Sequence, residues 1–144
     1  MSISDILFQR NKDKAEKNLN DGLAFLEQNK ANPNVQVLES GLQYEILQEG
    51  EGAHPTENSS VTCHYHGTTI DGKVFDSSVQ RGTPATFPLN RVIAGWTEGV
   101  QLMTQGSKFR FFIPAHLAYG DRQAGSDIGP NSTLIFEVEL LGIQ

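Results

Sequence analysis

The 144-residue sequence contains a single cysteine, Cys63, which excludes an internal disulfide and a thiolate zinc cluster. No apolar run approaches the roughly 18 residues of a membrane-spanning helix, and no basic segment followed by an apolar stretch marks a signal peptide. Basic residues are in the minority, with 11 Lys and Arg against 17 Asp and Glu and a net charge of −6, which argues against a nucleic-acid partner. The sequence therefore predicts a cytoplasmic protein, or a periplasmic one if an upstream segment is removed.

The signature motifs of common catalysts are missing as well. The sequence has no phosphate-binding loop, dinucleotide fingerprint, nucleophile elbow or HExxH helix. Cys63 lies in an apolar alternation, which favours a buried and unreactive thiol over a nucleophile. His64 and His66 share one face of a predicted strand, but two ligands are too few to hold a metal. We therefore expect no metal site and no cofactor.

Proline and glycine are scarce at the start of the chain. Residues 1–32 hold none of the six prolines and one of the 14 glycines, together with five basic and five acidic residues. This composition predicts one helix of about 25 residues, capped by Ser4 with Asp5 in its first turn and ended before Pro33. The chain then divides into a helix with a linker, 1–32, and a second domain, 33–144.

Apolar residues recur along this helix at nearly helical spacing. They are Phe8, Ala15, Leu19, Leu23 and Leu26. A single helix of this length cannot bury such a stripe by itself. Two interpretations stay open: the stripe packs on the chain's own second domain, or it meets a second copy in a homodimer.

Residues 33–144 contain 13 glycines, all six prolines and ten aromatic residues. Apolar and polar residues alternate here with the period of two that is typical of strands. The alternating apolar positions are Leu42, Tyr44 and Ile46; Val61, Cys63 and Tyr65; Phe109 and Phe111; and Phe136, Val138 and Leu140. Asp71-Gly72 predicts a hairpin turn, and the spacing of Trp96, Val100 and Met103 predicts one short helix within 91–103. The fold class expected is α+β, an antiparallel sheet with one helix across it.

The order of five motifs resembles the FKBP-type peptidyl-prolyl isomerase family over about residues 41–144. The motifs are His64–Gly67, Asp71–Ser78, Val92–Gly99, Ala118–Gly120 and Thr133–Leu141. Residues 83–87 and 125–131 resemble the bacterial branch that includes macrophage infectivity potentiator. The resemblance implies an antiparallel sheet wrapped around a short helix, with a hydrophobic pocket between them. It also implies that the N-terminal helical region, which dimerises in those relatives, is shortened here to about one helix.

The resemblance further implies site residues. Trp96 forms the pocket floor, and the substrate-binding positions around it are Tyr65, Phe75, Arg81, Phe87, Val92, Ile93, Ile128 and Phe136. Three positions carry the catalysis: the Tyr119 hydroxyl and the Ile93 N–H hold substrate carbonyls, and Asp76 lies at the rim near Tyr65 and Arg81. Asp76 either acts on the rotating carbonyl or orients Tyr65, and both roles stay open.

Two departures from the small eukaryotic members change the pocket rim. Ala85 follows Pro84 where those members have an aromatic residue, and the 121–130 loop is one residue longer and lacks a histidine. The partners implied are proline-containing peptides, partly folded proteins and macrolides such as rapamycin. The alternatives are a module that binds a proline loop without turnover, and a chaperone whose helix 4–29 holds its clients.

Overall fold

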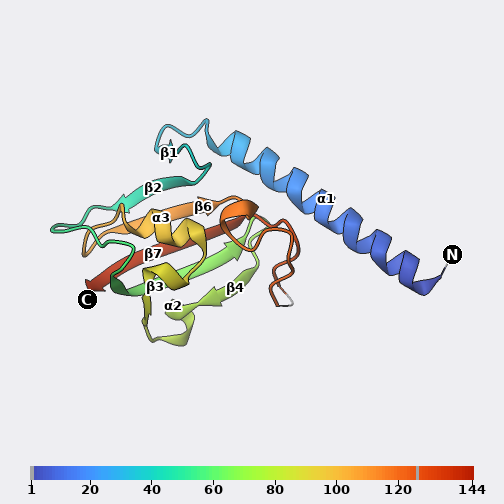
Figure 1. Cartoon of the computed structure of the whole chain (residues 1–144). Helices are drawn as coiled ribbons and strands as arrows, with labels where there is room; N and C mark the ends of the chain where they lie inside the picture. The colour runs from blue at the N-terminus through green and yellow to red at the C-terminus, as the bar shows by residue number, and fades with distance from the viewer. Residues whose placement is uncertain (1, 126) are drawn as a thin grey trace.

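The computed structural model describes residues 2–125 and 127–144, so Ser126 of the 125–131 motif lies outside the described residues, as does Met1. Figure 1 shows a twisted sheet with α3 across one face and a long helix, α1, that runs away from the body. The elements in chain order are α1 (Ile3–Asn29), β1 (Val35–Val37), β2 (Gln43–Gln48), β3 (Ser60–Thr69), β4 (Val74–Ser77), α2 (Ser78–Arg81), β5 (Ala85–Pro88), η1 (Leu89–Arg91), α3 (Ala94–Val100), β6 (Lys108–Ile113), η2 (Ala115–Leu117) and β7 (Leu134–Ile143).

Seven strands of the described residues form one antiparallel sheet: six follow the order β1-β2-β6-β7-β3-β4, and β5 pairs with β3 outside this order. The long strand β3 pairs with β7 on one side, whereas its other side pairs first with β5 and then with β4. A tight turn at Gly72, whose φ is +90°, joins β3 to β4, as the Asp71-Gly72 pair predicts. The predicted α+β architecture, a sheet around a short helix preceded by an N-terminal helix, is confirmed.

The main core lies between the sheet and α3. Alternation in β3, β6 and β7 puts the predicted residues inside, since Val61, Cys63, Phe111, Val138 and Leu140 are all fully buried. Helix α3 lies very close to β6 because it presents two glycines to that strand. A Cβ added at Gly95 would lie 2.6 Å from an Ile113 carbon, and one at Gly99 would lie 2.6 Å from a Phe111 carbon.

Three short elements were not predicted. One of them is β5, which pairs with Ser60–Cys63 of β3. Strand β1 and the single-turn helix α2 are likewise new. The helix expected within 91–103 is shorter, Ala94–Val100, and a separate 3-10 turn precedes it. These elements are only three to seven residues long, too short for hydrophobic periodicity to reveal them.

The predicted N-cap of α1 is wrong. Ser2, not Ser4, caps the helix: its hydroxyl accepts a hydrogen bond from the Asp5 N–H at 3.1 Å, and the Asp5 carboxylate accepts one from the Ser2 N–H. This reciprocal pair is a capping box, which satisfies two backbone donors at once. The predicted end before Pro33 is confirmed, because the helix stops at Asn29.

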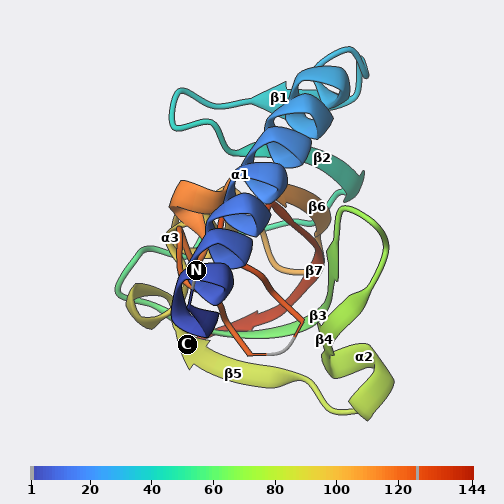
Figure 2. The same cartoon turned by 90° about the vertical axis from the view of Figure 1, so that its right-hand side faces the viewer.

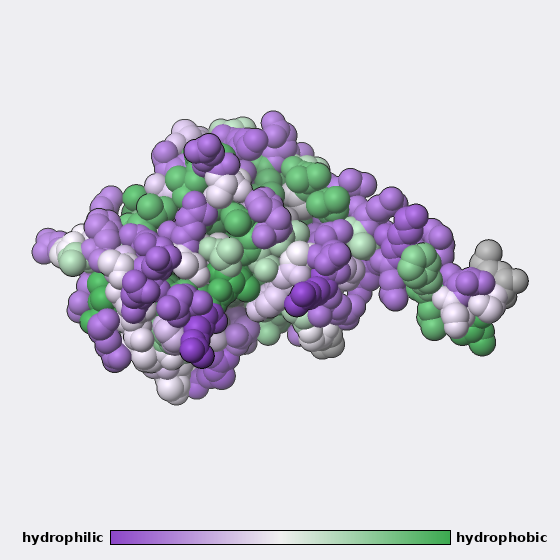
Figure 3. Space-filling view, viewed as in Figure 1, coloured by the Kyte–Doolittle hydropathy of each residue, from purple (hydrophilic) through white to green (hydrophobic). Residues whose placement is uncertain are grey.

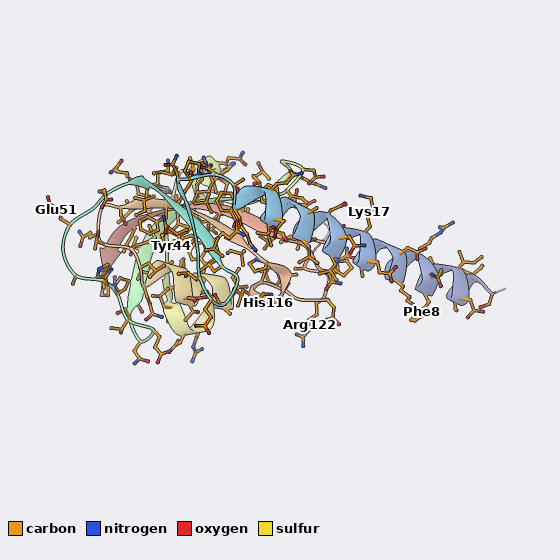
Figure 4. All side chains as sticks on the ribbon, turned by 90° about the horizontal axis from the view of Figure 1, so that it is seen from above. Phe8, Lys17, Tyr44, Glu51, His116 and Arg122 are labelled. Carbon is orange, nitrogen blue, oxygen red and sulfur yellow. The ribbon has the colours of Figure 1, made fainter. Side chains whose placement is uncertain are left out.

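The predicted apolar stripe of α1 is mostly not buried. Of its members only Leu26 is buried, whereas Phe8 is 70% exposed. The helix instead contacts the body through Gly22 and Leu26, with Phe25 tilted on Phe112 at 6.0 Å between ring centroids. Figure 2 places β1 and β2 beside this C-terminal half, and Figure 4 shows Phe8 far out on the other half. The C-terminal half of α1 therefore packs on the chain's own body.

Contact with α1 also changes β2. The alternation of Leu42, Tyr44 and Ile46 predicts Ile46 inside, but Ile46 is 44% exposed and Gln43 is buried. The Gln43 amide donates to the Leu26 carbonyl at 3.0 Å and accepts from Asn29 at 2.8 Å. The end of α1 thus covers the second face of β2, and its polar groups satisfy a glutamine there. No helix in the described part of the chain combines the length and the apolar character needed to span a membrane.

A cluster of charges bridges three strands on the sheet face opposite α3. Arg110 of β6 donates to Glu45 of β2 and to Glu137 of β7, both at 2.5 Å. The Arg110 guanidinium holds the pKa of the Glu137 carboxyl below its usual value, against a smaller opposing effect of burial. Cross-strand pairs of this kind stabilise the register of a sheet.

We expect the Arg110–Glu137 pair to make the free energy of unfolding depend on pH. The folded-state pKa of Glu137 is depressed, so its contribution is complete above the unfolded value of about 4.3 and is lost as pH falls through the folded value. On going from pH 7 to pH 3, the free energy of unfolding in urea should therefore fall less for Glu137→Gln than for the parent protein. Glu57→Gln, at an exposed loop position, should keep the parental dependence. Identical pH profiles for Glu137→Gln and the parent protein would contradict the prediction.

Candidate functional site

A pocket of about 460 Å³ opens where α3 meets the sheet. Its lining comes from six elements, β3, β4, β5, η1, α3 and β7, and from two connecting segments, residues 92–93 and Tyr119. The lining residues are Tyr65, Asp76, Phe87, Arg91, Val92, Ile93, Trp96, Tyr119 and Phe136. Figure 3 shows hydrophobic surface gathered in the middle of the body in the same view as Figure 1. The site is therefore an apolar hollow with its few charged groups on the rim.

Aromatic rings form the walls and meet Trp96 edge to face. Trp96 is the centre of the group, with ring centroids 5.4 Å from Tyr65, 5.2 Å from Phe87 and 5.3 Å from Phe136. All three contacts are edge-to-face, a favourable arrangement of aromatic quadrupoles. Gly67 makes room for the group, since a Cβ there would lie 2.7 Å from ring atoms of both Phe136 and Phe75. These contacts fix the shape of the pocket before any ligand binds.

Three polar side chains form a network at the rim. The Tyr65 hydroxyl donates to Asp76 Oδ2 at 2.8 Å, and Arg81 donates to both the Tyr65 oxygen, at 2.9 Å, and Asp76 Oδ1. Burial raises the pKa of the Tyr65 phenol, with Asp76 acting in the same direction and Arg81 against it. The guanidinium also lies over the Tyr65 ring, 5.6 Å from its centroid. Both carboxylate oxygens of Asp76 are therefore engaged within the protein.

Two further groups can hold a ligand's carbonyl oxygens. Tyr119, 42% exposed, follows the η2 turn and precedes Gly120, whose φ of +61° lets the chain reverse there. The Ile93 N–H, immediately before α3, has no hydrogen-bond acceptor among the residues that the structure describes. A free N–H at this position is one of the donors that a helix N-terminus leaves unsatisfied. The pocket therefore combines apolar walls with two separated hydrogen-bond donors.

The structure brings most of the predicted site residues together. The three predicted positions that do not line the pocket are adjacent to it: Phe75 packs edge-to-face on Phe136 at 5.3 Å, Arg81 holds Asp76, and Ile128 is buried in the same core cluster as Trp96. Arg91 is a lining residue that sequence reasoning missed. The sequence marks Arg91 as a candidate only by its place directly before Val92, because a single arginine forms no periodic pattern.

Other features of the molecule offer little chemistry. Burial raises the pKa of the Cys63 thiol to about 12, so it stays protonated and unreactive. A polar cavity of about 480 Å³ lies between α1 and the β3–β4 turn. Four of its charged side chains form ion pairs within the protein, Lys17 with Asp21 at 2.7 Å and Lys73 with Asp127 at 2.8 Å. Among residues 2–125 and 127–144, no three His, Cys, Asp or Glu side chains are grouped to hold a metal.

The fold and the pocket define a class of protein in which an antiparallel sheet curves around one short helix, and the sheet and helix enclose a pocket with aromatic walls. The FKBP-type peptidyl-prolyl cis-trans isomerase family model matches residues 51–141, and the model of the domain amino terminal to it matches residues 2–46. The chain belongs to the FKBP-type peptidyl-prolyl cis-trans isomerase family. The division at Pro33 stays a prediction.

Relatives of this chain include bacterial proteins of that family. The outer membrane protein MIP of Legionella longbeachae is 53% identical over 131 residues, which cover 91% of this chain and 56% of that protein. The probable isomerase FkpA of Neisseria meningitidis serogroup B is 50% identical over 135 residues, covering 94% of this chain and 50% of that one. The crystal structure of FkpA from Escherichia coli has a TM-score of 0.91 at 39% identity, over 94% of this chain and 63% of that one. The chain thus spans about half the length of the curated relatives it matches.

Proposed function

We propose that the protein is a peptidyl-prolyl cis-trans isomerase that accelerates rotation about X-Pro bonds in peptides and partly folded proteins. The observation that carries this proposal is the pocket itself, in which Trp96 lies under three edge-on aromatic rings while every charged lining group is on the rim. A proline ring is apolar, and the residues on each side of it supply the carbonyl oxygens that Tyr119 and the Ile93 N–H can bind.

The proposed mechanism needs no covalent step. Rotation about an X-Pro bond is slow because it breaks amide resonance, with a barrier of about 18–20 kcal/mol. The twisted transition state has lost this resonance and is less charge-separated than the planar amide. An apolar pocket therefore disfavours the planar ground state relative to the twisted state, whereas water does the opposite. Tyr119 and the Ile93 amide position the flanking carbonyls so that rotation is confined to one bond.

For Asp76 we favour the orienting role. Both of its oxygens already accept hydrogen bonds, one from the Tyr65 hydroxyl and the other from Arg81. A carboxylate held in this way fixes the Tyr65 ring against Trp96, and its charge is partly neutralised by the guanidinium. Acting on the rotating carbonyl would require Asp76 to give up one of these partners.

Three variants test the proposal on a chromogenic Ala-Leu-Pro-Phe peptide. Tyr119→Phe should lower kcat/KM about three- to tenfold, the effect of losing one hydrogen bond. Asp76→Leu should lower kcat/KM similarly, and Tyr65→Phe should reproduce that loss if Asp76 acts through Tyr65. Tyr44→Phe, which lies outside the pocket and stacks on Phe109, is the matched control and should leave the rate unchanged.

The outcomes separate the roles. A slow Asp76→Leu variant with a fully active Tyr65→Phe variant would assign Asp76 to the carbonyl itself. Full activity of Asp76→Leu would remove any catalytic role for that residue. A parent protein that does not accelerate the tetrapeptide at all would contradict the proposed function and favour a proline-binding module.

The proposal extends to partners and location. A macrolide such as rapamycin would occupy the same aromatic pocket and compete with the peptide.

Exposed apolar side chains on the projecting half of α1, with Ile3 78% and Phe8 70% exposed, support a monomer that associates weakly into a homodimer. The name of the Legionella longbeachae relative places that protein in the outer membrane. For this chain we therefore favour the cell envelope over the cytoplasm.

A further inference from the structure

An apolar groove of about 290 Å³ lies between α1 and the segment that carries Tyr119. Leu19, Leu23 and Leu26 form one wall, and Pro114, Ala115 and Gly120 form much of the other. We call this feature the leucine groove. Its position follows from the docking of α1, because its two walls come from parts of the chain about 90 residues apart in sequence.

The walls of the leucine groove are fixed relative to each other. The Asn18 amide donates to the Pro130 carbonyl at 2.9 Å, and the Asn131 amide donates to the Ala15 carbonyl at 3.3 Å. One turn further along α1, Gly22 lies so close to Thr133 that an added Cβ would be 2.3 Å from its hydroxyl oxygen. Two side-chain hydrogen bonds and one close contact thus hold α1 against residues 130–133, and the groove is part of the fold.

Two leucines of the groove have no apolar partner that covers them. Leu19 is 40% and Leu23 is 55% exposed, although both face a concave surface beside Leu26, which is buried. Figure 3 shows hydrophobic surface on α1 where the helix leaves the body, in the view of Figure 1. Apolar side chains that line a hollow yet remain in contact with water favour the binding of another apolar group.

The leucine groove lies beside the proposed substrate pocket. Tyr119 lines the pocket and its neighbour Gly120 lines the groove, so a single chain segment separates the two hollows. The Gly120 N–H is held by the Ala115 carbonyl at 2.8 Å, which keeps this segment compact. Tyr119 and Gly120 are neighbours, with Cα atoms about 3.8 Å apart, so an extended peptide that leaves the pocket past Tyr119 reaches the groove within a few residues.

We propose that the leucine groove binds a large apolar side chain of a polypeptide substrate, within a few residues of the proline held in the pocket. This inference rests on the proposed isomerase function and adds a preference for longer, partly folded substrates with exposed apolar residues. A concave hollow of about 290 Å³ suits a side chain on an extended strand better than the face of a second helix. The exposed apolar residues available to a second copy, Ile3 and Phe8, lie instead on the projecting half of α1.

The test compares peptides and variants in one isomerisation assay. A set of 12-residue peptides carries one Leu-Pro bond and a single Leu scanned outward on either side of it, each with a Ser counterpart. In the parent protein, Leu at the favoured position should raise kcat/KM about tenfold over Ser, as expected for burial of one such side chain. The double variant Leu19→Ser/Leu23→Ser should lose this preference and keep the parental rate on a tetrapeptide. The matched control Leu7→Ser/Phe8→Ser, on the projecting half of the same helix, should keep both the preference for Leu and the parental rate on the tetrapeptide.

A parent protein with no preference at any scanned position would overturn the inference, as would a Leu19→Ser/Leu23→Ser variant that retains the preference. Light scattering at the assay concentration tests the remaining alternative, that a second copy of the chain occupies the groove. A fall from dimer to monomer in Leu19→Ser/Leu23→Ser but not in Leu7→Ser/Phe8→Ser would assign the groove to a second copy.

A cross-linking experiment separates failure of the groove from failure of the proposed function. A 12-residue peptide with photoreactive leucine at each scanned position should cross-link to residues 19–26 or 114–120, whether or not the bond is isomerised. Absence of such cross-links in a protein that accelerates the tetrapeptide would contradict the groove alone. Cross-links without tetrapeptide turnover would contradict the enzyme and retain the groove.

Discussion

Phe136→Ala is expected to lower kcat/KM on a proline tetrapeptide by at least about tenfold and to reduce the free energy of unfolding by about 3–5 kcal/mol. Phe136 is 5% exposed and touches the rings of Tyr65, Phe75 and Trp96. Its removal leaves a cavity behind the pocket wall, into which Tyr65 and Trp96 can move. The pocket then loses its shape, while a domain of ordinary stability remains folded at low temperature.

Phe112→Ala provides the matched control. Phe112 is also 5% exposed, but it lies on the opposite face of the sheet, in a cluster with Leu26 and Val35. Urea unfolding should show a similar loss of stability for both variants, whereas the isomerisation rate of Phe112→Ala should stay close to that of the parent. Equal activity of the two variants would show that the Phe136 ring does not shape the site.

Gly99→Val is expected to cost about 1–3 kcal/mol of stability and to reduce activity together with it. A Cβ at Gly99 would lie 2.6 Å from Phe111, which is fully buried and has no room to turn away. Helix α3 must therefore move outward from β6, and Trp96, one turn earlier on the same helix, moves with it. The higher helix propensity of other residues over glycine, worth up to about 1 kcal/mol, is too small to compensate.

Gly142→Ala is the control for this substitution. Gly142 lies near the end of β7, and an added Cβ would meet no atom within 4 Å. Thermal unfolding should place Gly142→Ala near the parent and Gly99→Val several degrees lower, with a matching fall in the isomerisation rate. A Gly99→Val protein with parental stability would mean that α3 does not press against β6 as closely as described.

The central strands could be predicted from sequence because their signal is local. Val61 and Cys63 of β3 and Val138 and Leu140 of β7 alternate strictly with polar residues, and all four are fully buried. The period of two reports directly which side of a strand faces the core, provided that the other side faces water. β2 breaks that condition, because the end of α1 covers its second face and buries Gln43.

The face that α1 presents to the body could not be read from its apolar residues. The conspicuous leucines, Leu19 and Leu23, stay partly exposed, whereas Gly22 makes the closest contact. Glycine has no hydrophobic weight in a periodicity count, yet its missing side chain is what allows Thr133 to approach the helix. The same holds for Gly95 and Gly99 on α3, whose importance depends on Ile113 and Phe111 in a strand that follows later in the chain.

The site was predicted only through the order of its motifs. Tyr65, Asp76, Trp96, Tyr119 and Phe136 are spread over 72 positions of the sequence, and no local pattern joins them. Pairing of β3 with β7 brings Tyr65 beside Phe136, and the docking of α3 places Trp96 against both rings. Arg91, which also lines the pocket, belongs to none of the patterns that a sequence displays.

By itself the sequence determined the elements with a repeating signal: an N-terminal helix that ends before a proline, strands with alternating burial, and a Cys63 inside one of them. It also determined the chemistry available, since the chain offers aromatic rings and backbone donors. Only the tertiary structure decided that these rings meet edge-on around Trp96, that Asp76 is held by Tyr65 and Arg81, and that α1 docks beside Gly120. The physical reason is that periodicity reports how each segment faces water, whereas the pocket and the groove depend on contacts between segments that are distant in the chain.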